Sequence, residues 1–191
     1  MASGQITAWH AEHLNFARLL RLFEAQVALF AQGEEPDYAL IADIVQYLRE
    51  FPDVHHHRYE NEVFSLMGQR DPQLKPLVAR LLQEHRVIAA CGAALAARLD
   101  AVVSGAVVER AQVEAAAATF VSYYRTHLDA EESIMLPRAA AMLDAADWLE
   151  VARVVAGKSQ HDPLFGPQAE LRFRALRQRI EREALGAPAS R

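Results

Sequence analysis

Two histidine–glutamate pairs share one spacing, since His56 is followed four residues later by Glu60 and His127 is followed by Glu131. Residues four apart lie one above the other on the same face of a helix. Imidazole and carboxylate donors together suit iron, zinc and manganese, and of these an open-sited pair of ions most favours iron. A carboxylate has two oxygens, so the pattern predicts a metal site in which Glu60 and Glu131 bridge two ions.

Two further histidines, His13 and His85, lie on the apolar faces of their own helical segments. Trp9 and Phe16 share a face with His13, and Ile88 shares one with His85. A single buried histidine is usually a core residue that is satisfied by hydrogen bonds. Four buried histidines with two buried glutamates are costly unless they are paired or bind a metal. We therefore expect two histidines and two bridging carboxylates around each ion.

The elements that carry these residues are predicted from turn signals and helical periodicity. The expected helices cover residues 5–31, 37–67, 72–103, 108–143, 146–156 and 168–184. Four long helices with short links favour an all-α, up-down-up-down antiparallel four-helix bundle. We expect the bundle to occupy residues 1–145. Residues 146–191 are expected to form a C-terminal helical extension packed on it, with a frayed tail.

The heights of the four histidines along such a bundle agree with one another. Neighbouring antiparallel helices meet at equal distances from their connecting turn, and the turns are centred near residues 34, 70 and 106. Counted from these centres, each neighbouring pair of histidines matches to within one residue, which is about 1.5 Å of helical rise. The sequence thus predicts that His13, His56, His85 and His127 lie in one layer.

A ferritin-like di-iron site is the main structural alternative, and its motif is Glu-x-x-His. No histidine in this chain has a glutamate three residues before it, and only Asp53 before His56 comes close. The chain also lacks the His-Glu-x-x-His, Gly-x-Ser-x-Gly and glycine-rich phosphate-loop motifs. The order of histidine before glutamate therefore disfavours ferritin-like chemistry.

Composition excludes several other classes of protein. The formal net charge is −5 and no basic stripe is evident, so nucleic acid is not expected as a partner. Cys91 is the only cysteine, which excludes an internal disulfide and a thiolate metal site. No apolar run reaches about 18 residues, so no membrane span is expected. Without a recognisable signal peptide, the expected location is the cytoplasm.

For three residues beside the proposed ligands, the sequence indicates only roughly which way the side chain points. His57 points about 100° away from His56 on an α-helix, so we expect it to be exposed or to lie behind a ligand. Glu62 and Glu132 are expected to point outward or to lie behind the ligands. Glu132 in particular can reach the imidazole N–H of a neighbouring ligand.

Three more residues leave the size of the ligand set open. His10 lies one turn before His13, and His161 and Asp162 lie in the connection that precedes the last predicted helix. Asp162 is favoured as the cap of a turn before Pro163, with capping of the metal site as the alternative. Whether any of the three adds a further donor is not decided by the sequence.

In order and in register, several motifs resemble those of the hemerythrin-like family, also called HHE cation-binding domains. They are Glu12-His13-x-Asn15-Phe16, Phe51-Pro52-x-x-x-His56-His57-x-x-Glu60, Glu84-His85, Tyr124-x-x-His127-x-x-x-Glu131-Glu132-x-x-x-Leu136-Pro137 and Asp162-Pro163-Leu164-Phe165-Gly166. The resemblance implies two iron ions bridged by carboxylates and an oxo or hydroxo group. Its ligands carry over to His13, His56, Glu60, His85, His127 and Glu131.

One departure from the family bears on function. Oxygen-carrying members use His-x-x-x-His on the third helix, but here the second position is Ala89. The chain is closer to a branch with two bridging glutamates, which includes iron sensors and iron–sulfur repair proteins. This implies a protein that binds or senses oxygen, nitric oxide or peroxide, or takes part in handling iron or oxidative stress. Two alternatives stay open: an oxidoreductase acting on nitric oxide or peroxide, and a metal-stabilised interaction module that forms a homodimer.

Overall fold

The computed structural model describes residues 2–155 and 162–184, and every regular element within them is helical. The all-α class is therefore confirmed for this part of the chain. His161 and the tail that we expect to fray lie outside the described residues. No helix of the described residues is long and apolar enough to cross a membrane.

The helices from α1 to α7 follow one another with short links. The α-helices are α1 (Ala2–Ala31), α2 (Tyr38–Glu50), α3 (His57–Arg70), α4 (Lys75–Val103), α5 (Arg110–Ala130), α6 (Leu136–Met142), α7 (Ala145–Val155) and α8 (Arg174–Ala184). π-Helical segments cover Pro52–His56 and Glu131–Met135, and short 3₁₀ turns cover Pro72–Leu74 and Leu171–Phe173.

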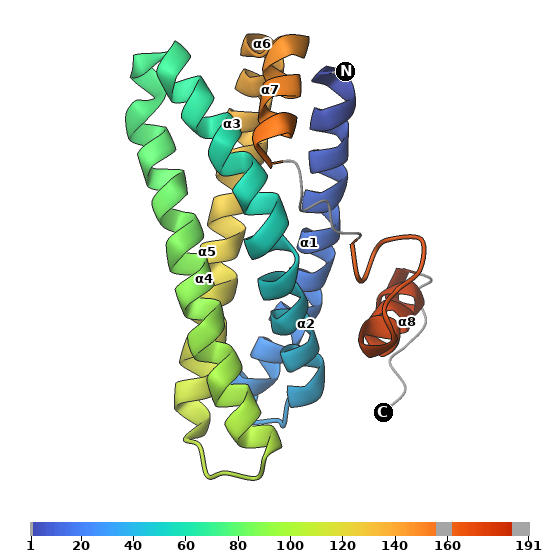
Figure 1. Ribbon diagram of the computed structural model, residues 1–191. Coiled ribbons are helices and arrows are strands. Elements are labelled where there is room, and N and C mark those ends of the chain that lie inside the picture. Colours follow the sequence, from blue (N-terminus) through green and yellow to red (C-terminus); the bar gives the residue numbers. More distant parts are fainter. Residues whose placement is uncertain (1, 156–161, 185–191) are drawn as a thin grey trace.

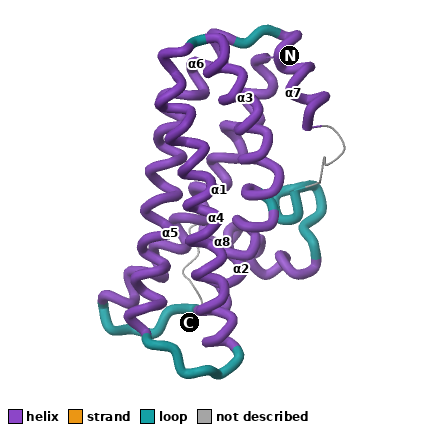
Figure 2. The backbone as a smooth tube through the Cα atoms, turned by 60° about the vertical axis from the view of Figure 1, so that its left-hand side comes forward, coloured by secondary structure: helices purple, strands orange, loops and turns teal. Residues whose placement is uncertain are grey.

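The long helices lie side by side, with α4 and α5 joined by a turn at the bottom of the view in Figure 1. α4 packs against α2 and α5, α1 packs against α5, and α3 packs against α4. The loops gather mainly at the two ends of this stack (Figure 2). Gly33 and Gly105 end α1 and α4 with positive φ angles of 75° and 80°, which a glycine adopts without strain. Of the C-terminal helices, α7 packs on α3 and α8 packs on α2.

The apolar core is divided into two clusters by the predicted histidine layer. Phe16, Ile44 and Ile88 belong to one cluster, and Trp9 and Val63 belong to the other. Along α1, for example, His13 lies between Trp9 of one cluster and Phe16 of the other. Along the helix axes, the layer is therefore covered by apolar side chains on both of its faces.

The first π-helical segment interrupts the helix that the sequence predicts as continuous over 37–67. The backbone N–H of His57 donates to the carbonyl of Pro52, which is the i→i−5 bond of a π-turn. Pro52 has no backbone N–H, so the regular i→i−4 bond cannot form at that residue. The prediction of one uninterrupted α-helix is therefore wrong here, and the proposed ligand His56 is the last residue of the irregular segment.

The second π-helical segment interrupts the helix predicted over 108–143 in the same way. The N–H of Leu136 donates to the carbonyl of Glu131, another i→i−5 bond. Pro137 follows directly and lacks a backbone N–H. This segment begins at the proposed ligand Glu131, so both departures from α-helical geometry occur at the histidine layer. π-Turns inside α-helices are frequently found at functional sites.

Candidate metal centre

The structure brings together all six residues that the sequence predicts as ligands. His13 comes from α1, Glu60 from α3, His85 from α4 and His127 from α5, while His56 and Glu131 come from the two π-helical segments. All six are buried, with His85 the most exposed at 6%. Six ionisable side chains thus meet inside the bundle, away from bulk water.

One group of donor atoms is formed by His13, His56 and Glu60. The Nε2 atoms of His13 and His56 are 2.8 Å apart. Oε1 of Glu60 lies 2.9 Å from Nε2 of His56 and 3.2 Å from Nε2 of His13. Adjacent donors at about 2.1 Å from a metal ion are spaced by roughly this much. The group therefore has the dimensions of one face of a metal coordination sphere.

A second group is formed by His85 and His127 with the same glutamate and with Glu131. Oε1 of Glu131 lies 3.0 Å from Nε2 of His127 and 3.4 Å from Nε2 of His85. Nε2 of His85 also lies 3.5 Å from Oε2 of Glu60. Glu60 therefore directs one oxygen to each group of histidines.

Glu131 is divided between the two groups in the same manner. While its Oε1 faces His85 and His127, its Oε2 lies 3.6 Å from Nε2 of His13. Both carboxylates thus lie between two sets of imidazole nitrogens. This is the arrangement needed by a carboxylate that bridges two cations.

Several of these donor atoms have no hydrogen-bond partner within the described residues. They are Oε2 of Glu60, both carboxylate oxygens of Glu131, and Nε2 of His85 and of His127. A buried polar atom without a partner costs free energy, and native proteins contain few of them. A concentration of such atoms at one point fits a cation, because a metal ion would accept electron pairs from all of them.

The outer nitrogens of the four histidines are all hydrogen-bonded, whereas the inner Nε2 atoms of His85 and His127 have no hydrogen-bond partner among the described residues. His56 Nδ1 contacts Glu12 at 2.5 Å and His127 Nδ1 contacts Glu84 at 3.0 Å. In each case the acceptor comes from a neighbouring helix. A donor hydrogen at Nδ1 leaves the lone pair on Nε2, which is the atom that faces the centre of the layer.

The remaining two outer contacts follow the same pattern. His13 Nδ1 lies 2.7 Å from Glu132, and His85 Nδ1 lies 2.7 Å from the amide oxygen of Asn61. The expectation that Glu132 can reach a neighbouring imidazole is confirmed, and Glu62 is exposed as expected. His10 shares the Glu132 carboxylate at 2.8 Å but is 54% exposed, so it lies at the rim of the layer.

The charges in the layer stabilise one another. Burial lowers the pKa of His13, but its contacts with Glu132 and Glu60 outweigh burial and raise the pKa to about 10. The pKa of His127 is likewise raised to about 10, chiefly by Glu131 acting against burial. Burial raises the pKa of Glu60, yet the surrounding imidazoles hold it well below its usual value. Metal binding would therefore replace protons, because a metal needs the imidazoles in their neutral form.

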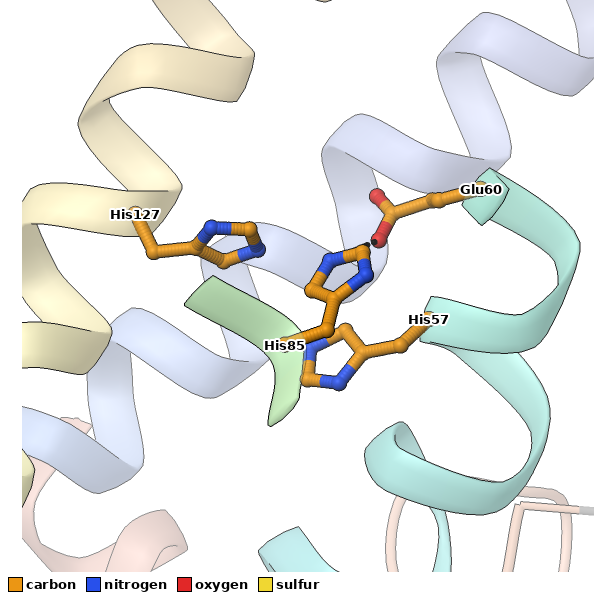
Figure 3. Close-up of side chains that lie close together, drawn as sticks. All are labelled: His57, Glu60, His85 and His127. Atoms are coloured by element: carbon orange, nitrogen blue, oxygen red, sulfur yellow. Dashed lines mark ion pairs between the residues drawn. The ribbon is translucent and has the colours of Figure 1, made fainter. Parts of the chain in front are cut away.

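His57 is buried, so of the two expectations for this residue, exposure is wrong and a position behind a ligand remains. Its side chain is 3% exposed, and its ring stacks on that of His85 with a centroid distance of 4.2 Å and an interplanar angle of 13°. Figure 3 shows it beside Glu60, His85 and His127. Burial, together with the neighbouring imidazoles, lowers the pKa of His57 well below its usual value, which favours the neutral ring. The i→i−5 winding before it explains the error, because it turns successive side chains by less than the α-helical 100°.

Asp162 lies away from these groups and caps a turn, as the sequence favours. Its Oδ1 accepts hydrogen bonds from the backbone N–H groups of Leu164 and Phe165. Its Oδ2 accepts from the hydroxyl of Tyr47 at 3.0 Å. The carboxylate therefore ties the C-terminal connection to α2.

A surface cavity of about 370 Å³ leads towards the second group of donors. It is lined by His57, His85 and Asn61, and also by Ala89, one turn beyond His85 on α4. The small side chain at position 89 leaves this space unfilled. The cavity provides a short route between solvent and the α3–α4 side of the layer.

Comparison with known proteins agrees with the geometry. The family described as the hemerythrin HHE cation-binding domain matches residues 5–139, which contain all six predicted ligands. No curated protein and no solved structure matched the chain. The matched range covers well over half of the sequence, and its family description agrees with the buried histidine–glutamate layer. The chain therefore belongs to the hemerythrin HHE cation-binding family.

Proposed function

We propose that this protein binds two iron ions in the buried layer, with His13, His56, Glu60, His85, His127 and Glu131 as ligands. The observation that carries the proposal is the position of the two carboxylates, each of which directs its oxygens to both groups of histidines. In this proposal, His13 and His56 hold one ion, His85 and His127 hold the other, and Glu60 and Glu131 bridge them.

The donor set supports iron. Two imidazoles and two carboxylate oxygens give each ion four protein donors, and a bridging oxo or hydroxo group would give a fifth. An octahedral ion then keeps an open position, and iron with histidine and carboxylate ligands supplies redox and small-ligand chemistry at such positions. The chain's own residues contribute the orientation of the imidazoles through Glu12, Glu84 and Glu132.

The best-supported function is the binding or sensing of a small ligand such as oxygen, nitric oxide or peroxide, or a part in iron or oxidative-stress handling. Apolar side chains enclose the layer on both sides and exclude bulk water. The hydroxyl of Tyr124 is fully buried and has no hydrogen-bond partner among the described residues, so it is a donor available to a small polar ligand. The cavity beside His57 and His85 is wide enough for small molecules.

The proposal extends to the organisation of the chain. We propose an up-down-up-down antiparallel four-helix bundle over residues 1–145 and a C-terminal extension over 146–191, in a cytoplasmic protein that does not bind nucleic acid. The contacts of α7 with α3 and of α8 with α2 support an extension packed on the bundle.

The experiment that tests the function is metal analysis combined with visible spectroscopy. Protein from iron-replete cells should contain about two iron ions per chain, as expected for a site with two carboxylate bridges. Its visible spectrum should change on admitting oxygen, nitric oxide or peroxide to the anaerobic reduced protein. Protein that stays free of iron after anaerobic reconstitution would refute the proposal, and iron without any spectral response would refute the small-ligand function alone.

A further inference from the structure

A fifth imidazole lies in the buried layer beside the six proposed ligands. His57 offers a donor atom that lies within 4.8 Å of donor atoms of Glu60, His85 and His127, with all four residues buried. A separate set of His13, His56 and Glu60 meets the same criterion. The donors of the layer therefore divide into one set with two imidazoles and another set with three.

The ring of His57 resembles the rings of the proposed histidine ligands in the surroundings of its two nitrogens. Its Nδ1 lies at ion-pair distance, 3.2 Å, from Oδ1 of Asp53, a carboxylate four residues earlier in the same segment. Its Nε2 is buried and has no hydrogen-bond partner among the described residues. A carboxylate beside Nδ1 and a buried Nε2 without a partner are two features of a histidine prepared to bind a metal.

A purely structural role accounts less well for this side chain. A core histidine is normally hydrogen-bonded at both ring nitrogens, because an unpartnered buried nitrogen costs free energy. The ring of Tyr124 is a neighbour of the His57 ring, with centroids 5.9 Å apart. Within the described part of the chain its hydroxyl also lacks a partner, so the two groups do not satisfy each other. Packing on His85 contributes contact area but leaves Nε2 unsatisfied.

We propose that His57 is an additional metal ligand, and that it binds the ion held by His85 and His127. The inference rests on the proposed function, since it requires a metal in the layer. It makes the two ions unequal, with two imidazoles on the α1 side and three on the α4–α5 side. The open position of the proposed function would then belong to the ion on the α1 side.

Position 89 allows a matched test, because α4 contributes only one donor to this set. Ala89 lies one turn after His85 and lines the same cavity as His57 and His85. A histidine at position 89 would therefore extend from α4 into the space next to the same ion. Such a residue should replace the donor that is lost when His57 is removed.

The test compares His57→Ala with His55→Ala, which removes a half-buried histidine of the same segment. Both variants and the unsubstituted protein are loaded with iron, and in parallel with Co²⁺ as a spectroscopic probe. We expect His57→Ala to release one of its two ions to a competing chelator at least about 10-fold more readily, since even an outer partner contributes that much. Its Co²⁺ absorption spectrum should change, whereas His55→Ala should match the unsubstituted protein in both measurements.

Two rescue experiments separate loss of a ligand from loss of packing. Free imidazole should restore tight metal binding to His57→Ala. The double variant His57→Ala/Ala89→His should also bind metal tightly, because the new histidine supplies the lost donor. His57→Gln, which keeps most of the side-chain volume, replaces His57→Ala if circular dichroism shows that the alanine variant is unfolded. Unchanged chelator competition and an unchanged Co²⁺ spectrum in a folded His57 variant would overturn the inference while leaving the two-ion site intact. An unsubstituted protein that binds no metal would instead refute the proposed function.

Discussion

The two apolar clusters and the ionisable layer between them are equally buried, but their side chains are satisfied in different ways. Ile44 and Leu95 are fully buried and need only the contacts of their neighbours. Glu60 and Glu131 are also fully buried, yet carboxylate oxygens of both have no hydrogen bond from residues 2–155 and 162–184. The apolar clusters are therefore complete as folded, whereas the layer lacks a partner that a cation would supply.

The largest expected effect is the loss of metal on removing a bridge. Glu60→Ala should lose at least one ion per chain, because both ions would lack a donor and the pair would lack one negative charge. Glu62→Ala is the matched control, since Glu62 is exposed only two residues away. Metal counts on the two purified variants show whether Glu60 or Glu62 is the ligand. An empty site in Glu62→Ala with a full site in Glu60→Ala would refute the ligand set.

The converse substitution removes apolar packing and leaves the layer untouched. Ile44→Ala should destabilise the protein by about 2–5 kcal/mol, which is the usual cost of an isoleucine-to-alanine cavity. The metal content of the folded fraction should stay at the value of the unsubstituted protein. Denaturant unfolding and metal analysis on one preparation test this separation. Loss of metal from well-folded Ile44→Ala protein would show that the layer and the apolar cluster are not independent.

Metal removal is expected to destabilise the fold by a similar or smaller amount. A ligand that binds only the folded state stabilises it by about 2.7 kcal/mol when its free concentration is 100 times its dissociation constant. Chelated protein should accordingly melt at a lower temperature than the iron-loaded protein. Calorimetry with and without a chelator measures the difference. Coincident melting curves for samples of verified metal content would mean that the layer is stable without a cation.

The meeting of the six residues could be predicted from the sequence because it depends on two regular quantities. Helical periodicity determines which side chains face inward, and distance from the turns determines their height. Both quantities tolerate an error of about one residue, so the π-helical segments did not disturb the layer. The same periodicity placed Glu62 outside correctly.

The outer contacts could be predicted only in part. Glu12 and Glu84 each precede a histidine of the layer, but they serve His56 and His127 on neighbouring helices. Assigning them requires the rotation of two helices at once, which periodicity on one helix does not supply. The sequence does indicate these outer contacts through two adjacent pairs, Glu12-His13 and Glu84-His85. In each pair the histidine faces inward and the glutamate faces the next helix.

The burial of His57 could not be predicted, because an angle of about 100° between His56 and His57 holds only for regular α-helical winding. A proline permits several local responses, including a kink, a break or a π-turn. Which of them occurs depends on the packing of α2 and α3 against α4 rather than on the local sequence. The i→i−5 bond from His57 to Pro52 then brings His57 into the interior beside His56.

A smaller effect is expected from the outer carboxylates. Glu84→Gln keeps an acceptor for His127 Nδ1 but removes its charge, so it should weaken metal binding by about 10–100-fold without changing the number of ions at saturation. Chelator competition measures the change in affinity. Glu109→Gln, at an exposed glutamate before α5, is the matched control for the general loss of one negative charge. Equal effects of the two variants would argue against a specific role for the outer contact.

The smallest expected effect concerns the one outer partner that carries no charge. His85 Nδ1 faces the amide oxygen of Asn61, whereas His13, His56 and His127 all face carboxylates. Asn61→Asp keeps the shape of the side chain and supplies the missing carboxylate. A charged acceptor makes the stronger hydrogen bond and raises the basicity of the imidazole.

Asn61→Asp should therefore tighten metal binding by a few-fold and at most about 10-fold, the lower limit for an outer partner. The new carboxylate would line the same cavity as Asp53 and Glu62, and the repulsion among the three would be relieved by a bound cation. Both contributions thus have the same sign. Asn61→Ala, which removes the acceptor, should loosen binding instead, and chelator competition on the pair gives the two directions. If Asn61→Asp binds metal more weakly than the unsubstituted protein, the carboxylates beside the other three histidines do not act through imidazole basicity, and their role would be restricted to holding the rings in place.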